Sequence, residues 1–302
     1  MALLHAHQST DGLFWEIFEE IFLHGLLDTL KLVPFLFLTY LLMEFIEHKA
    51  SERVEDFMKR AGALGPLVGG ALGAFPQCGF SASAANLYAA RVLTVGTLIA
   101  VFLSTSDEML PVMISGGMPI QNIIAILVYK VISGVIVGLL ADLAVRLTSK
   151  PREDINIDAI CDEDNCHCER GIFYSALHHT LTISGFVLIV TMLINALVFF
   201  VGTEALSSLL RGLPVVSHLI SAVFGLIPNC AVSVALTSFF TEGIITAGTM
   251  MAGLFSGAGV GILVLFRVNK SVKENLFIVL TLVLSGVIFG LIFDLVFLGL
   301  LV

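Results

Sequence analysis

Carboxylate, imidazole and thiol side chains, which coordinate metals and carry protons, occur at a few isolated places in an otherwise apolar chain. Asp107 and Glu108 are adjacent in the apolar stretch AVFLSTSDEMLPVMIS, just before Pro111, a residue type that kinks helices. Ionisable residues within such a stretch are costly and are functional hypotheses by default. Two carboxylates beside a broken helix would bind a cation or carry a proton. The alternative is that the helix ends early and leaves both at the surface.

A second group of acids lies in the sequence LMEFIEHKA. Glu44, Glu47 and His48 have the spacing i, i+3 and i+4, which places them on one face of a helix. Carboxylate and imidazole ligands together suit Mn²⁺, Fe²⁺ or Zn²⁺. The alternative for Glu47 and His48 is a helix end at an interface. Glu44 lies one turn deeper, which favours a functional role for it.

Two cysteines follow prolines in similar apolar surroundings, in the segments FPQCGFS and IPNCAVS. Cys78 and Cys230 are candidate ligands for a thiophilic metal or metalloid. The alternative is that these small side chains only allow close packing. Further polar groups of the same segments are candidates to line one cavity: the amides of Gln77 and Asn229 and the hydroxyls of Ser81 and Ser233.

The third cysteine group lies in the polar sequence CDEDNCHCERG. It offers enough ligands for one soft ion, namely Cys161, Cys166, His167 and Cys168. Their spacing is not that of a standard zinc finger. We therefore expect a segment that captures or senses metal, with a solvated acidic linker as the alternative.

Composition places all these residues in a membrane protein. Of the 302 residues, 57% are hydrophobic and 13% are charged, the net charge is -9 and the mean hydropathy is +1.00. These values exclude a soluble enzyme, a disordered tail and a nucleic-acid binder, which would need a basic face. Long continuous apolar runs favour helices over an alternating barrel. We expect an all-α multi-pass protein in lipid contact in the plasma or inner membrane.

The chain consists of two related units. A shift of 152 residues superimposes the PQC and PNC segments, and also SGVIVGLLADL (133–143) on SGVIFGLIFDL (285–295). Asp142 thereby falls on Asp294, late in both helices, where a structural role is expected. With one residue of slip, Glu44 falls on Asn195, which is also polar. Because the matches include Pro, Cys, Ser, Gly and Asp, shared apolar composition does not explain them.

Each unit is expected to contain five helical segments, of which the paired short ones cannot cross a bilayer. The expected helices are 26–48, 61–75, 79–90, 92–114 and 121–146, then 174–200, 214–227, 229–240, 243–266 and 275–301. The short pairs are read as re-entrant or broken hairpins. The expected organisation is an amphipathic segment (1–25), a first repeat (26–146), a cytoplasmic Cys/acid-rich loop (147–173) and a second repeat (174–302).

The distribution of basic residues predicts that the two units are inverted. Lys and Arg favour cytoplasmic loops. They occur after the first span and after residue 266, but are sparse or absent in the loops that the repeat makes equivalent. Inverted repeats with broken helices near the midplane are typical of secondary transporters. Lys130, within a span, is expected either to be a counter-ion of Glu44 or Asp107 or to reach outward to the interface.

The segments LMEFIEHKA, GAFPQCGFS and GLIPNCAVSVALTSFF resemble the ten-transmembrane heavy-metal exporter family, whose members are called arsenic efflux proteins or manganese transporters. The resemblance extends over nearly the whole chain, and the PQCGFS and PNCAVS segments are its most specific part. It implies an exporter of a metal or metalloid ion. A loop rich in Cys or His between the halves also fits.

The leading hypothesis is a secondary-active exporter whose ion binds between the two hairpin tips. Protons or sodium are the candidate coupling ions, since no Walker A motif indicates ATP. Carboxylates favour manganese as cargo, and the paired cysteines favour arsenite. The alternative is a transporter of a small organic or anionic solute. The absence of HExxH and GxSxG motifs argues against an enzyme. No cofactor is expected, and a homodimer is left open.

Overall fold

The computed structural model describes residues 64–74, 78–106, 109–148, 172–201 and 214–297, with scattered residues between 22 and 41. The elements within these ranges are helices, and no strand occurs in them. In chain order they are α4 (Gly65–Gly73), α5 (Cys78–Ala89), α6 (Val95–Ser104), α7 (Met109–Ser115), α8 (Ile120–Thr148), α10 (Ile172–Val201), α12 (Pro214–Gly225), α13 (Cys230–Thr241), α14 (Ala247–Ser256), α15 (Val260–Val268) and α16 (Val272–Phe297).

Five helical stretches of the described chain are long and apolar enough to cross a membrane. They are Val95–Ser115, Ile120–Leu147, Ala176–Leu193, Ala247–Val268 and Val272–Val296. The most apolar, Val272–Val296, is also the least buried inside the protein, as expected for a helix that faces lipid. The chain is therefore an all-α polytopic membrane protein.

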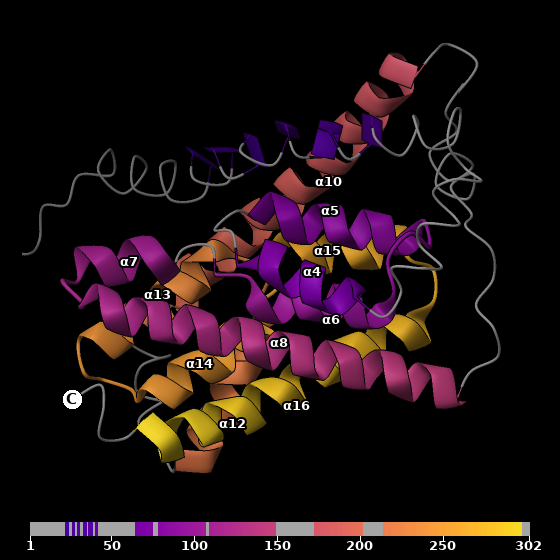
Figure 1. Cartoon of the computed structure of the whole chain (residues 1–302). Helices are drawn as coiled ribbons and strands as arrows, with labels where there is room; N and C mark the ends of the chain where they lie inside the picture. Colours follow the sequence, from indigo (N-terminus) through magenta and orange to yellow (C-terminus); the bar gives the residue numbers. More distant parts are fainter. Residues whose placement is uncertain are drawn as a thin grey trace, which may run out of the picture.

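The two halves of the chain form matching bundles of helices. In the first, α6 packs against both α4 and α8; in the second, α14 packs against both α12 and α16 (Figure 1). Matching helices begin 152 residues apart, as the pairs Cys78 and Cys230, Val95 and Ala247, and Ile120 and Val272 show. The repeat detected in the sequence thus appears as two similar sets of packed helices.

An aspartate fixes the long helix of each bundle to the start of its neighbour. Asp142 accepts hydrogen bonds from the Thr94 hydroxyl (2.7 Å) and the Gly96 N–H (2.8 Å). The threonine also caps α6, because its oxygen accepts a hydrogen bond from the Thr97 N–H. In the second half Asp294 accepts hydrogen bonds from the Thr246 hydroxyl and the Gly248 N–H, both at 2.6 Å. This geometry agrees with the structural role expected for both aspartates.

Glycines allow this contact between helices to be very close. A Cβ at Gly96 would collide with the carbonyl oxygen of Gly138, and a Cβ at Gly248 would collide with that of Gly290. Small residues permit such backbone contact between helices in membranes. The two Gly–Gly contacts bring the N–H groups of α6 and α14 within reach of the aspartates.

The short helices exchange partners between the halves. α5 of the first half packs against α15 of the second, and α13 of the second half packs against α7 of the first (Figure 1). These contacts join the two bundles, so the interface between the halves is built largely from the hairpin segments and the broken helices.

We expect Gly96→Ala to destabilise the protein, because the added Cβ meets a main-chain oxygen that has no freedom to move away. The cost should be roughly 1–3 kcal/mol, the usual range for overpacking, and thermal unfolding of the detergent-solubilised protein would measure it. Gly185→Ala in α10 is the matched control, since a Cβ there has no neighbour within 4 Å. Equal melting temperatures for the two variants would contradict the close-contact interpretation.

Candidate functional site

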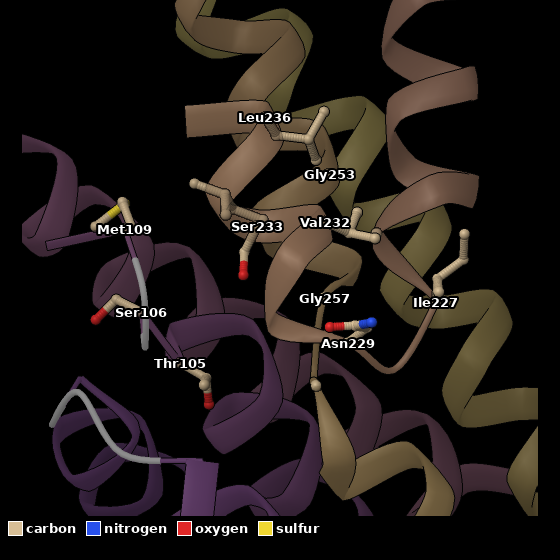
Figure 2. A pocket seen from close by; sticks show the side chains of 13 residues that line it. Thr105, Ser106, Met109, Ile227, Asn229, Val232, Ser233, Leu236, Gly253 and Gly257 are labelled. Carbon is tan, nitrogen blue, oxygen red and sulfur yellow. The ribbon is translucent and has the colours of Figure 1, made fainter. Parts of the chain in front are cut away.

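A hollow lies where the two halves meet, between α13 and the junction of α6 with α7 (Figure 2). Its empty volume is about 450 Å³, counting the part that is open. Its walls come from both halves: Thr105, Ser106, Met109, Gly225, Ile227, Asn229, Val232, Ser233, Leu236, Gly253, Leu254, Gly257 and Gly259. This set includes the second predicted tip and both helix breaks.

Both breaks follow from local sequence. α6 ends at Ser104 and α7 begins at Met109, so Pro111 falls in the first turn of α7. Proline is tolerated there because an N–H group in the first turn has no hydrogen-bond partner within the helix. In the second half α14 ends at Ser256 and α15 begins at Val260. Gly259 has φ = 52°, a conformation that favours glycine. The break predicted at the same place in both units is therefore confirmed.

Serine hydroxyls at both breaks bind carbonyl oxygens of the same helix or of the short helix beside it. Ser104 donates to the carbonyl of Ala100 (2.6 Å), and Ser106 donates to that of Ala74 at the end of α4 (3.2 Å). Ser256, the equivalent of Ser104, donates to the carbonyl of Ala222 in α12 (2.6 Å). The end of each broken helix is thus tied to the short helix packed beside it.

Lys130 joins the two breaks. Its ammonium group donates to the carbonyl of Thr105 in the first half and to that of Leu254 in the second, the latter at 3.1 Å. Its Nζ also lies 5.8 Å from the centre of the Phe255 ring. The side chain is 0% exposed, so the alternative that it reaches outward is wrong, and its predicted counter-ions Glu44 and Asp107 lie outside the described residues. Both carbonyls belong to residues that line the hollow, so the Lys130 amino group lies directly behind its wall.

Two of the predicted tip residues line the hollow. Asn229 is buried, and Ser233 lies one turn along α13 on the same wall (Figure 2). Cys230, between them, is the first residue of α13, and Cys78 is the first residue of α5. Of these two cysteines the structure describes the backbone only. Ser81, the equivalent of Ser233, is buried in α5 against Gly261 and does not line the hollow.

The other predicted site residues are not placed by the structure. Asn195 lies on α10, with only its backbone described. The remaining predicted residues lie outside the described ranges: Glu44, Glu47, His48, Gln77, Asp107, Glu108, Cys161, Cys166, His167 and Cys168. Ser106 and Met109, the chain neighbours of Asp107 and Glu108, both line the hollow.

Sequence reasoning did not identify Thr105, Met109, Gly257 or Gly259 as lining residues. All four lie at the helix breaks, so the only available signal was the pattern of interruption shared by the two units. These residues line the hollow because of where the helices break, and they present main-chain groups and one methionine side chain there. Their residue types alone do not indicate such a position.

The described lining residues provide separate oxygen ligands rather than a cluster of metal-binding side chains. Hydroxyl groups come from Thr105, Ser106 and Ser233, and an amide comes from Asn229. Within the described ranges, no group of three or more His, Cys, Asp or Glu side chains gathers as a metal site would. Oxygen donors of this kind suit hard cations or hydrogen-bonded solutes.

We expect Lys130→Met to destabilise the junction of the halves by about 1–3 kcal/mol, because the carbonyls of Thr105 and Leu254 would lose a charged donor. Thermal unfolding in detergent would measure the loss. Leu282→Met is the control, since Leu282 is the equivalent buried position of the second half. Unchanged stability of Lys130→Met would show that the ammonium does not hold the junction.

Comparison with known proteins agrees with this architecture. The model of a family described as "Putative, 10TM heavy-metal exporter" matches residues 18–173, just over half of the chain. Neither the curated proteins nor the solved structures gave a match. The matched range contains the first helical bundle, the α6–α7 break and Lys130. On this evidence the chain belongs to the ten-transmembrane heavy-metal exporter family.

Proposed function

We propose that this protein is a secondary-active exporter of a heavy-metal or metalloid ion, and that the ion binds in the hollow between the halves. The observation that carries this proposal is the meeting of two helix breaks, one from each half, at one hollow. Interrupted helices present main-chain groups at a protein-lined cavity, which is how many secondary transporters bind their cargo. Membership of an exporter family supports the same reading.

The two halves would be inverted relative to each other in the membrane, an arrangement supported by the charge of equivalent loops and by the contacts between helices. Basic residues gather where α15 ends and α16 begins, at Arg267, Lys270 and Lys273, whereas residues 115–121, which the repeat makes equivalent, contain none. Under the positive-inside rule these equivalent loops lie on opposite sides. The exchange of partners between α5–α15 and α13–α7 is compatible with this arrangement. The membrane would be the plasma or inner membrane.

Asp107 and Glu108 are the proposed negative ligands, because their chain neighbours line the hollow. Together with Asn229 and the hydroxyl groups they would form an oxygen-rich site for a divalent cation such as Mn²⁺. Cys78 and Cys230 are the alternative ligands, and they would favour a thiophilic ion such as arsenite. Glu44 would take part in the transport cycle. Protons or sodium would be the coupling ions, and no bound cofactor is proposed.

Lys130 favours a second candidate function. A buried ammonium behind the wall and the N-terminus of α13 both attract negative charge. If no acids faced the hollow, these two features would suit a small anionic solute better than a cation. The charge that Asp107 and Glu108 bring therefore decides between the two functions.

Export from metal-loaded cells tests the proposal. We expect the wild-type chain, expressed in an export-deficient host, to lower cellular Mn²⁺, and Asp107→Asn/Glu108→Gln to lose at least about tenfold of this activity because a charged ligand pair is removed. Glu242→Gln, an exposed acid at the end of α13, is the control and should transport normally. Surface expression is measured for every variant.

The other outcomes separate the remaining candidates. Protection against arsenite that is lost in Cys78→Ala/Cys230→Ala would assign the cargo to the thiols. No change in any metal, with all variants at the surface, would contradict metal export and bring the anionic-solute function forward.

A further inference from the structure

The two halves supply equivalent clefts, and the structure holds them differently. One cleft lies between α13 and the α6–α7 junction, where Ser233 and Met109 line the hollow. The repeat places the other between α5 and the α14–α15 junction, with Ser81 and Gly261 at the equivalent positions. There the helices touch: a Cβ at Gly261 would lie 2.8 Å from the Ser81 Cβ and 2.9 Å from the Phe102 ring.

A polar network closes the rim of the α5–α15 cleft. The Tyr88 hydroxyl at the end of α5 donates to Glu274 Oε2 (2.6 Å), and Arg91 donates to the same oxygen (2.9 Å). Glu274 lies in the first turn of α16, directly after α15. Asn269, the C-cap of α15, is held against Asn275 by a side-chain hydrogen bond of 2.6 Å. The network therefore joins the exit of the first hairpin to the loop between α15 and α16.

The equivalent rim of the other cleft cannot form this ion pair. Tyr88, Arg91 and Glu274 correspond to Phe240, Gly243 and Asn122. The backbone is the same in both places, since Arg91 and Gly243 have positive φ values of 63° and 72°. Glycine is the favoured residue in that conformation. The first half instead has an arginine in this left-handed conformation, which non-glycine residues rarely adopt. We infer that the contact of the guanidinium group with Glu274 compensates for the strain.

We propose that the α5–α15 cleft is a second entrance to the cargo hollow, closed in this structure, and that the Tyr88–Arg91–Glu274 network is its lock. This inference rests on the proposed transport function, because a transporter must open its site to one side at a time. The lock lies beside the basic loop after α15, so it would close the cytoplasmic entrance.

The burial of the network suits a lock that must release. The Arg91 and Glu274 side chains are 21% and 36% exposed, and ion pairs so exposed contribute little stability. Tyr88 is 0% exposed and adds a hydrogen bond to the same carboxylate. The network thus ties two elements together without the large penalty of separating a fully buried ion pair.

Cysteine labelling of the full-length protein in detergent tests the lock. Ala85→Cys places a thiol one turn after Ser81 in α5, at a position that is 0% exposed. A maleimide reagent is added, and labelling of each cysteine is read from its own peptide by mass spectrometry. We expect Glu274→Gln and Arg91→Gly to raise the labelling rate at residue 85 about fivefold, as loss of an exposed ion pair and one hydrogen bond allows.

Two comparisons separate release of a lock from general loosening. Arg91→Gly removes the guanidinium but relieves the backbone, so its melting temperature should not fall. A second reporter, Ser233→Cys in the hollow, should label more slowly in the same lock variants if one cleft closes as the other opens. Glu242→Gln, at the end of α13, should change neither reporter.

An unchanged rate at residue 85 in both lock variants would overturn the proposal, as would faster labelling of both reporters together. The readout does not involve cargo. Altered labelling in a chain that exports no metal would uphold the lock and reject the proposed cargo, while normal export with unaltered labelling would reject the lock alone.

Discussion

A helix that stops within hydrocarbon leaves main-chain carbonyl groups that only the protein itself can satisfy. This constraint governs the centre of the molecule, where α6 ends at Ser104 and α14 ends at Ser256. The hydroxyls of both serines bind nearby carbonyls, and the ammonium of Lys130 takes one carbonyl from each half. The need to satisfy the two breaks is therefore met partly by a contact that crosses between the halves.

The two halves have the same residue types at some close helix contacts, but different residue types at equivalent positions near the hollow. Where helices touch through their backbones, the geometry requires the same residues, and Gly96, Asp142 and their equivalents are identical in type. At other positions near the hollow the two halves differ. There Lys130 is matched by Leu282, and Met109 by Gly261. The same backbone plan thus carries different chemistry at its two equivalent clefts.

Much of the architecture could be predicted from sequence, because long apolar runs, prolines and a constant offset act locally. The expected segment 229–240 corresponds to α13 (Cys230–Thr241), and the interruption near Pro111 was located correctly. Asn229 and Ser233 were identified as lining residues from their place beside the tip. Inversion of the halves in the membrane stays a prediction.

Contacts between distant residues could not be predicted in the same way. Arg91 and Glu274 are separated by 183 residues and lie in segments that look like ordinary solvated loop ends. Lys130 was recognised as unusual, but it binds main-chain carbonyls of Thr105 and Leu254, and every residue possesses such a group. Residue type therefore gave no indication of which carbonyls it would bind. Only the folded positions of α8, α6 and α14 determine them.

The buried charge of Lys130 constrains any cargo of the hollow. Within a low-dielectric interior an ammonium group repels a nearby cation strongly unless negative charge offsets it. In a metal transporter that offset must come from the protein, and Asp107 and Glu108 are the acids closest in sequence to the lining residues. In an anion transporter the cargo itself would supply it. A protonated Lys130 would thus link the identity of the cargo to the ionisation of two adjacent carboxylates.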